Sequence, residues 1–397
     1  MKFKSRLKVL LCLLVTSVAC FLPAQAQQPV SINGFGSVRL GKLLPSKDNP
    51  QLVEFYNDDG LSFADDTLFG LQLQTESSAD LSYTLQLLGK ALEDYDPDVS
   101  LAFVRYQLAP DHQLKFGRLA VPLFAQSDIQ YVGYSHDYSR LPKALYYRFD
   151  FEVADGVAFE GQQIFQDFSL KYVLQLTEFS GNVFKRQGSG GIPIKLHQMN
   201  NLRLELAYQQ LQLFAGGVRA DTDADQLNAQ LLAPLLPQLQ ASTASLAAQQ
   251  QFMAALNFNK DAAYTFWGLR WQYQAWRLEA ERSRYGISDS ADVINTAEYL
   301  ALSYRFDRVI VTLHQEKQTE NPENVQWLTQ VTAPELRQIG INLSRSLNNT
   351  SYRMQVLSLR YDLQPGIALK ADIFNGKHQL ANVGRFKGFS LGVDFVF

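Results

Sequence analysis

The sequence predicts an all-β fold: a transmembrane antiparallel β-barrel of about sixteen strands. Three observations lead to this prediction. Apolar and polar residues alternate with a two-residue period along much of the chain, the connections between these segments are in turn short and long, and the chain ends on an aromatic strand. After the first 26 residues, no segment approaches the roughly 18 consecutive apolar residues of a membrane-spanning helix.

The last ten residues show the alternation most clearly. Apolar side chains stand at every second position from Phe389 to Phe397, and Ser390, Gly392 and Asp394 stand between them. Such a strand has one apolar and one polar face. In a soluble sheet an exposed apolar edge invites aggregation, whereas closure into a barrel removes the edge and the bilayer covers the apolar face. The ending therefore favours a barrel in lipid.

The amino terminus predicts export. Four basic residues precede an apolar run over residues 9–21, and Ala24-Gln25-Ala26 supplies small residues for cleavage. We expect residues 1–26 to be a secretory signal peptide for the Sec pathway, cleaved after Ala26. A single anchoring helix and a lipid-modified leader at Cys20 are the alternatives. Both cysteines of the chain lie in this leader, so the barrel over residues 27–397 is expected to contain no disulfide.

Composition limits the class of partner. The formal charge is −3, and it becomes −7 without the leader, which holds four cations and no acidic residue. An acidic, exported chain without a basic patch is a poor binder of nucleic acid. Aromatic residues make up 12% of the chain, which suits the aromatic girdles at the two surfaces of a membrane barrel.

Sixteen segments carry the strand pattern, and an even number returns both termini to the same side of the membrane. The predicted strands are 30–40, 67–74, 81–88, 99–108, 112–119, 156–165, 168–177, 201–208, 211–219, 263–273, 276–285, 297–305, 308–316, 352–363, 367–375 and 388–397. Short turns rich in Pro, Asp and Gly alternate with long connections, as in barrels with tight periplasmic turns and large outer loops.

Two of the long connections contain further patterns. Segments 325–331 and 336–345 would form an extra hairpin, so eighteen strands is the alternative count. We prefer sixteen, with 317–350 as a long outer loop that keeps some strand character. Residues 226–256 are rich in Ala, Gln and Leu and are interrupted by prolines. They predict a partly helical outer loop that covers the pore mouth or a neighbouring subunit.

Charged residues occur on the polar faces of the strands. By strand parity, five cations point inward: Arg39, Arg105, Lys115, Arg360 and Lys370. Such charges are costly in the dry core of a soluble β-sandwich, but a water-filled lumen accommodates them. Sixteen strands leave a lumen too wide for side chains alone to fill. We expect these cations to line a pore; the alternative is that each is an ordinary solvated lumen residue.

The connection at 120–154 is unusually long and rich in aromatic residues, which an outer loop would expose to water. We therefore expect it to fold into the lumen and constrict the pore. The segment also contains four carboxylates: Asp128, Asp137, Asp150 and Glu152. We expect some of them to face Arg39, Arg105 and Lys115 across the narrowed opening, where opposed charges would sort solutes by charge and size.

Short motifs resemble a known family. Gly117-Arg118 followed by Pro122 is similar to the Gly-Arg-x-x-x-Pro run that leads into the third loop of trimeric Gram-negative porins, and residues 357–372 look like the penultimate hairpin of that family. The ending resembles the closing strand of outer-membrane barrels, in which the terminal aromatic residue, here Phe397, is an assembly signal. The resemblance implies a constricting third loop and a location in the bacterial outer membrane.

The same resemblance implies a homotrimer, with outer-membrane lipid, lipopolysaccharide and the barrel-assembly machinery as partners. The seam between the first and last strands contains three glycines, Gly34, Gly36 and Gly41. These small residues are candidates for close contact between subunits or for barrel curvature.

The predicted function is that of a porin, a water-filled channel for passive diffusion of small hydrophilic solutes and ions. A substrate-specific channel is the closest alternative, followed by a surface adhesin or receptor and by an outer-membrane hydrolase. We expect no enzymatic activity, because Ser127 and His136 share the long loop without a third orienting group. We expect no cofactor and no metal site, because the aspartate runs at 94–98 and 221–225 lack the glycine and glutamate of calcium loops.

Overall fold

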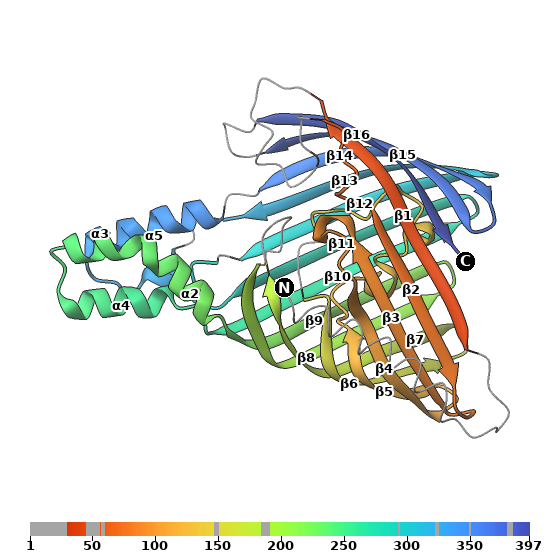
Figure 1. Cartoon of the computed structure of the whole chain (residues 1–397), viewed down its shortest axis with the longest axis horizontal. Helices are drawn as coiled ribbons and strands as arrows, with labels where there is room; N and C mark the ends of the chain where they lie inside the picture. The colour runs from red at the N-terminus through yellow and green to blue at the C-terminus, as the bar shows by residue number, and fades with distance from the viewer. Residues whose placement is uncertain are drawn as a thin grey trace, which may run out of the picture.

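The computed structural model of the 397-residue chain describes residues 30–44, 56, 60–146, 151–183, 191–292, 294–321, 325–348, 351–378 and 384–397. Its strands form one closed barrel in which each strand is antiparallel to its neighbours in sequence and β16 pairs with β1 (Figure 1). The predicted leader 1–26 and Asp150 lie outside the described residues.

The sixteen predicted segments all form strands, so the predicted count is confirmed. The strands are β1 Ser31–Leu43, β2 Leu68–Glu76, β3 Leu81–Lys90, β4 Asp98–Ala109, β5 His112–Ala120, β6 Val153–Ile164, β7 Phe168–Val183, β8 Ile192–Tyr208, β9 Leu211–Asp223, β10 Asp261–Tyr273, β11 Trp276–Ile287, β12 Asn295–Phe306, β13 Val309–Glu320, β14 Tyr352–Gln364, β15 Ile367–His378 and β16 Arg385–Val396. Short 3-10 turns lie between some of them: η2 Ala91–Glu93, η3 Ser127–Ile129, η4 Gly133–Ser135, η5 Ala233–Leu235 and η6 Gln326–Leu328.

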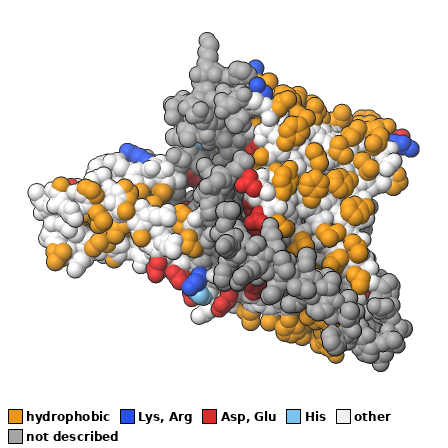
Figure 2. Space-filling view, in the orientation of Figure 1, with side chains coloured by type: hydrophobic (Ala, Val, Ile, Leu, Met, Phe, Trp, Pro, Cys, Tyr) orange, Lys and Arg blue, Asp and Glu red, His pale blue; other side chains and the backbone are white. Residues whose placement is uncertain are grey.

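Alternation along each strand gives the barrel two different faces. On β14, Val356, Ser358 and Arg360 are buried inside the barrel, whereas Leu357 and Leu359 are 45% and 47% exposed on the outside. Exposed apolar side chains cover the barrel wall, orange in Figure 2. In a soluble monomer, water would surround an apolar band of this extent. The band matches the apolar belt by which a membrane barrel contacts lipid.

The two ends of the barrel differ in their connections. At one end, two-residue turns join β8 to β9, β10 to β11, β12 to β13 and β14 to β15. Gln209, Gln274, Asp307 and Gly366 close these turns with φ of 50°, 52°, 50° and 83°, the left-handed geometry of tight hairpins. The other end carries the long connections, including the one between β5 and β6.

Two outer connections build a helical projection beyond the loop end of the barrel (Figure 1). It contains α2 Asp225–Leu232, α3 Leu236–Ala241, α4 Leu246–Leu256 and α5 Pro334–Leu347. Phe252, Trp327 and Leu336 belong to its own apolar core, separate from that of the barrel. The predicted helical character of 226–256 is confirmed, but the projection extends away from the barrel end, and the predicted cover over the pore mouth is not seen.

The eighteen-strand alternative is wrong, and so is the predicted strand character between β13 and β14. Residues 336–345 lie within α5, and η6 occupies 326–328. Pro334 stands in the first turn, where its missing N–H costs no hydrogen bond. Leu336, Ile339 and Leu343 recur at helical spacing and pack in the projection. No helix in the described part of the chain is long and apolar enough to span a membrane.

Aromatic rings of β16 and its end cover the seam glycines. Gly34 and Phe397 exchange two backbone hydrogen bonds of 2.9 Å. A Cβ on Gly34 would lie 2.1 Å from the Phe397 ring, and one on Gly36 would lie 2.5 Å from the Phe395 ring. Gly41 lies against Tyr56. These glycines therefore make room for the chain's own rings, and the expected contact between subunits at this seam stays a prediction.

Candidate functional site

The connection between β5 and β6 spans residues 121–152, and we call it the inner loop. Its described residues 121–146 enter the lumen. Arg203 of β8 donates to the Ala125 carbonyl at 2.8 Å. Arg277 of β11 contacts Asp137 at 2.6 Å. Arg360 of β14 donates to the carbonyls of Tyr134 and His136 at 2.6 and 2.8 Å. Because these arginines come from separate parts of a closed wall, a segment can reach all of them only from inside.

Lys370 of β15 holds the backbone of the inner loop. Its Nζ donates to three carbonyls, those of Gly133, His136 and Tyr138, at 2.7, 2.7 and 3.0 Å. The side chain is 3% exposed. A buried ammonium needs such partners, since an unpaired charge away from water is costly.

Asp394 of β16 joins two strands to this anchor. It accepts from Arg39 of β1 at 2.7 Å and pairs with Lys370 at 2.9 Å. Arg39 also donates to Ser139 of the inner loop. All three charged side chains are essentially buried, and we call Arg39, Lys370 and Asp394 the seam triad. It binds the inner loop to the place where the barrel closes.

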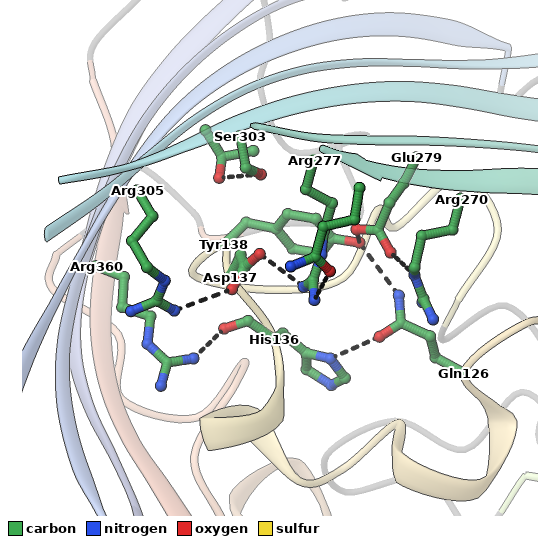
Figure 3. A network of polar contacts seen from close by, with 12 residues as sticks. Gln126, His136, Asp137, Tyr138, Arg270, Arg277, Glu279, Ser303, Arg305 and Arg360 are labelled. Atoms are coloured by element: carbon green, nitrogen blue, oxygen red, sulfur yellow. Dashed lines mark hydrogen bonds and ion pairs between the residues drawn. The ribbon is translucent and has the colours of Figure 1, made fainter. Parts of the chain in front are cut away.

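Further along the wall, a second set of arginines surrounds the segment His136–Tyr138 (Figure 3). Asp137 lies between Arg277 and Arg305, at 2.6 and 3.9 Å. The Tyr138 hydroxyl donates to Glu279 of β11 at 3.2 Å, and Arg270 of β10 pairs with the same carboxylate at 2.6 Å. Both basic and acidic side chains of the wall thus contact the loop, on β8, on strands from β11 to β15 and on β1.

Apolar packing supports these polar contacts. Phe124, Leu141, Leu145 and Tyr146 of the inner loop are each at most 1% exposed. The rings of Phe124 and Tyr146 lie 4.5 Å apart, and the Tyr146 hydroxyl donates to Glu281 at 2.9 Å. Folding inward therefore buries the aromatic side chains that an outer loop would expose.

For the described loop carboxylates Asp128, Asp137 and Glu152, the predicted pairing with Arg39, Arg105 and Lys115 is wrong. Each of these cations contacts a side chain of the barrel wall, and Arg39 in addition donates to Ser139 of the loop. Arg39 pairs with Asp394, Lys115 with Glu160 at 2.7 Å, and Arg105 donates to Ser82 at 2.9 Å. The reason is the path of the loop, which its anchors hold against β8, against β11 to β16 and against β1.

The loop carboxylates have other partners. Asp128 lies 3.6 Å from Arg203, and Asp137 pairs with Arg277. Glu152 accepts from Gln130 at 2.6 Å and from Tyr131, within the loop itself. Of the five predicted cations of the wall, Arg39, Arg360 and Lys370 contact the loop. They do so mainly by donating to its backbone carbonyls.

Sequence reasoning did not single out Glu281, Arg305 or Asp394 as site residues. The strand alternation places all three inward, and that signal was available. The sequence did not reveal their partners. Asp394, for example, contacts Arg39 only because β1 and β16 pair when the barrel closes.

A cavity of about 430 Å³ remains beside the inner loop. It is lined by residues of β4 to β8 and of the turn between β4 and β5, and by Asp128 of the loop. Its charged residues have both signs: Lys171, Arg203, Asp111, Asp128, Glu160 and Glu205. The space that the loop leaves open is therefore polar and is lined by both positive and negative side chains.

Burial determines the protonation state of His136 in the inner loop. It lowers the pKa of His136 to about 3, with the positive charge of Lys370 acting in the same direction, so the imidazole is neutral at physiological pH. His136 contacts Gln126 and the Gln130 carbonyl, whereas Ser127 contacts the backbone of Phe124. These contacts do not join Ser127 to His136 as a nucleophile and its base.

Asp66, in the connection between β1 and β2, lies 3.6 Å from Arg140 and 3.8 Å from Lys143 of the inner loop. Burial alone would raise its pKa, but Lys143 and Arg140 beside it lower that pKa to about 2. Among the described residues, no group of three or more His, Cys, Asp or Glu side chains is arranged to hold a metal ion.

No family model matches the sequence, and no curated protein matches it. Solved structures do match. The anion-selective porin of Comamonas acidovorans superposes with a TM-score of 0.55 and 10% identity, covering 94% of this chain and all of that one. The outer-membrane channel DcaP of Acinetobacter baumannii gives 0.55 and 11%, covering 95% and 99%. In-vitro folded OmpT of Vibrio cholerae, in its trimer form, gives 0.52 and 11%, covering 94% and 100%. The chain has the fold of these outer-membrane barrels.

Proposed function

We propose that the protein is a porin of the bacterial outer membrane, which lets small hydrophilic solutes and ions diffuse passively through a water-filled lumen. The observation that supports this most is the polar cavity of about 430 Å³ that remains between the inner loop and β4 to β8. The inner loop narrows the lumen and thereby sets an upper limit on solute size. A barrel of sixteen strands is wide enough for such a channel, because side chains alone cannot fill it.

A substrate-specific channel is the second candidate. The close packing of the inner loop against the wall favours it, since a tightly narrowed lumen contacts its solute on several sides. The opposed charges of Lys171 and Arg203 with Glu160 and Glu205 suit a small solute that carries both signs. In either case the proposed activity is transport without catalysis.

Conductance across a planar bilayer tests the proposal. The purified protein should conduct steadily, and a specific channel should in addition be blocked by its solute. Lys171→Glu should shift ion preference toward cations by about two- to fivefold, because it reverses an exposed charge in the cavity. The matched control is Lys195→Glu on the outer face of β8, which should keep the parental selectivity. A protein that inserts without conducting would contradict the proposal.

We also propose that the protein assembles as a homotrimer, as the trimer form of OmpT does, with Phe397 read by the barrel-assembly machinery. Light scattering of the detergent complex, corrected for bound detergent, should give the mass of three chains. A monomer with the full conductance of the membrane-extracted protein would reject the trimer.

A further inference from the structure

The connection between β1 and β2 ends in residues 60–67, which are bonded to β1; we call them the outer segment. Ser62 and Gly41 exchange two backbone hydrogen bonds of 2.9 Å. The Thr67 hydroxyl accepts from the Arg39 N–H at 3.0 Å and donates to the Arg39 carbonyl at 3.2 Å. These contacts hold the outer segment to the wall at two points, so the residues between them have defined positions.

Asp66 of the outer segment contacts two cations of the inner loop. Arg140 and Lys143 lie 3.6 and 3.8 Å from its carboxylate, and the Tyr56 hydroxyl donates to it at 2.8 Å. The side chains of Arg140, Lys143 and Asp66 are 3%, 13% and 10% exposed. Charges this far from bulk water are weakly screened by salt, so the carboxylate attracts both cations strongly.

Arg140 is enclosed by aromatic rings as well as by charges. Its guanidinium lies 5.7 Å from the centre of the Tyr56 ring and 4.9 Å from that of Phe374 on β15, within reach of cation–π attraction. Asp372 of β15 lies 3.7 Å from the same guanidinium. The Tyr56 ring fits against the wall because Gly41 has no side chain, and a Cβ there would lie 2.3 Å from the ring. The connection and the wall therefore hold Arg140 together.

This contact acts on a different part of the loop from the anchors on the strands. Lys370 and Arg360 donate to backbone carbonyls between residues 133 and 138, whereas Asp66 contacts side chains of the following segment, 140–146. The apolar residues of this segment pack in the core that the loop forms with the wall: Leu141, Ala144, Leu145 and Tyr146. Because the wall lies behind it, the segment can be displaced only toward the open lumen.

We propose that Asp66 is a positioning residue of the pore, which holds Arg140 and Lys143 and thereby keeps the segment 140–146 out of the open lumen. Tyr56 supports it by orienting the carboxylate. Asp66 acts through the loop and not through contact with the solute. The size of the opening then depends on an outer connection as well as on the barrel wall. The inference rests on the proposed conduction through the lumen.

The test is Asp66→Asn, recorded as single channels in planar bilayers. Loss of the charge should let the segment 140–146 enter the lumen, so the mean current should fall by roughly a third and its fluctuations should grow about threefold. Uncharged polymers should be excluded at a smaller size. Asp66→Glu keeps the charge and should restore most of the parental behaviour. Tyr56→Phe should act in the same direction as Asp66→Asn, with a smaller effect.

The matched control is Asp65→Asn. Asp65 belongs to the outer segment and accepts from Ser62 at 2.7 Å, so this variant removes the same charge from the same connection and should conduct like the parent. In a Lys143→Gln background, Asp66→Asn should have about half of its effect, because one of its two partners is already lost. Equal changes in Asp65→Asn and Asp66→Asn, or the full effect of Asp66→Asn without Lys143, would overturn the inference.

Hydrogen exchange in detergent follows the loop independently of conduction. The amides of Leu145 and Tyr146 donate to the Pro142 carbonyl at 3.2 and 3.0 Å, so they exchange slowly only while the segment keeps its shape. Asp66→Asn should speed this exchange about tenfold and leave the strands unchanged; Lys143→Gln serves if that variant does not fold. Unchanged exchange would contradict the inference, whereas a parent that does not conduct would contradict the proposed function alone.

Discussion

Deleting residues 128–145 should raise single-channel conductance about threefold or more, because the barrel would then approach the open lumen of a sixteen-stranded wall. The deletion removes the contacts of Asp137, Tyr138 and Ser139 with the wall, together with the buried Leu141 and Leu145. It leaves the strands and their register intact. Planar-bilayer recording with salts and with uncharged polymers of increasing size measures both the conductance and the size limit.

The control is a deletion of residues 226–256, bridged by a short linker. These residues belong to the helical projection beyond the barrel end, so their loss should leave conductance close to that of the parent (Figure 1). An inner-loop deletion that folds and conducts like the parent would show that the loop does not limit the pore.

Asp394→Asn should lower the free energy of unfolding by about 3 to 5 kcal/mol, the range found when one member of a buried ion pair is removed. Asp394 is fully buried, and it is the carboxylate that pairs with both Arg39 and Lys370. Without it, two buried cations repel each other beneath the inner loop. Urea unfolding in detergent micelles, followed by tryptophan fluorescence, measures the loss.

The matched control is Asp362→Asn. Asp362 also pairs with two cations, Arg305 and Arg360, at 2.9 and 2.7 Å, but its side chain is 23% exposed. Water screens this site, so the loss should be about 1 kcal/mol or less. Equal losses in the two variants would mean that the seam triad does not stabilise the barrel through burial of its charges.

The strands were predictable because a lipid-facing wall imposes a strict two-residue period on the sequence. Errors occurred where this period is interrupted. β8 begins at Ile192, well before the predicted residue 201, because the pairing with β9 shifts register between His197 and Asn200, and Gln198 adopts a φ of 50°. Such a bulge moves the side chains to the opposite faces.

Of the candidate site, only the residues that the barrel wall contributes were predictable from the sequence. Strand parity correctly places Arg39, Arg360 and Lys370 inside the barrel. It does not give their partners, because Lys370 binds the backbone carbonyls of Gly133, His136 and Tyr138. A carbonyl is present at every residue, so its role depends on the path of the chain and has no signature in the sequence.

The seam triad has a consequence for the order of assembly. Arg39 and Asp394 are 355 residues apart in the chain and meet only when the first and last strands pair. The anchor for the inner loop is therefore completed by the final step of barrel closure, when Phe397 pairs with Gly34. Before that step the long loop lacks its buried carboxylate. The contacts of the loop with β8 to β14 do not depend on this step, so we expect closure to complete the narrowing of the lumen by fixing the segment that contains Gly133 and Ser139.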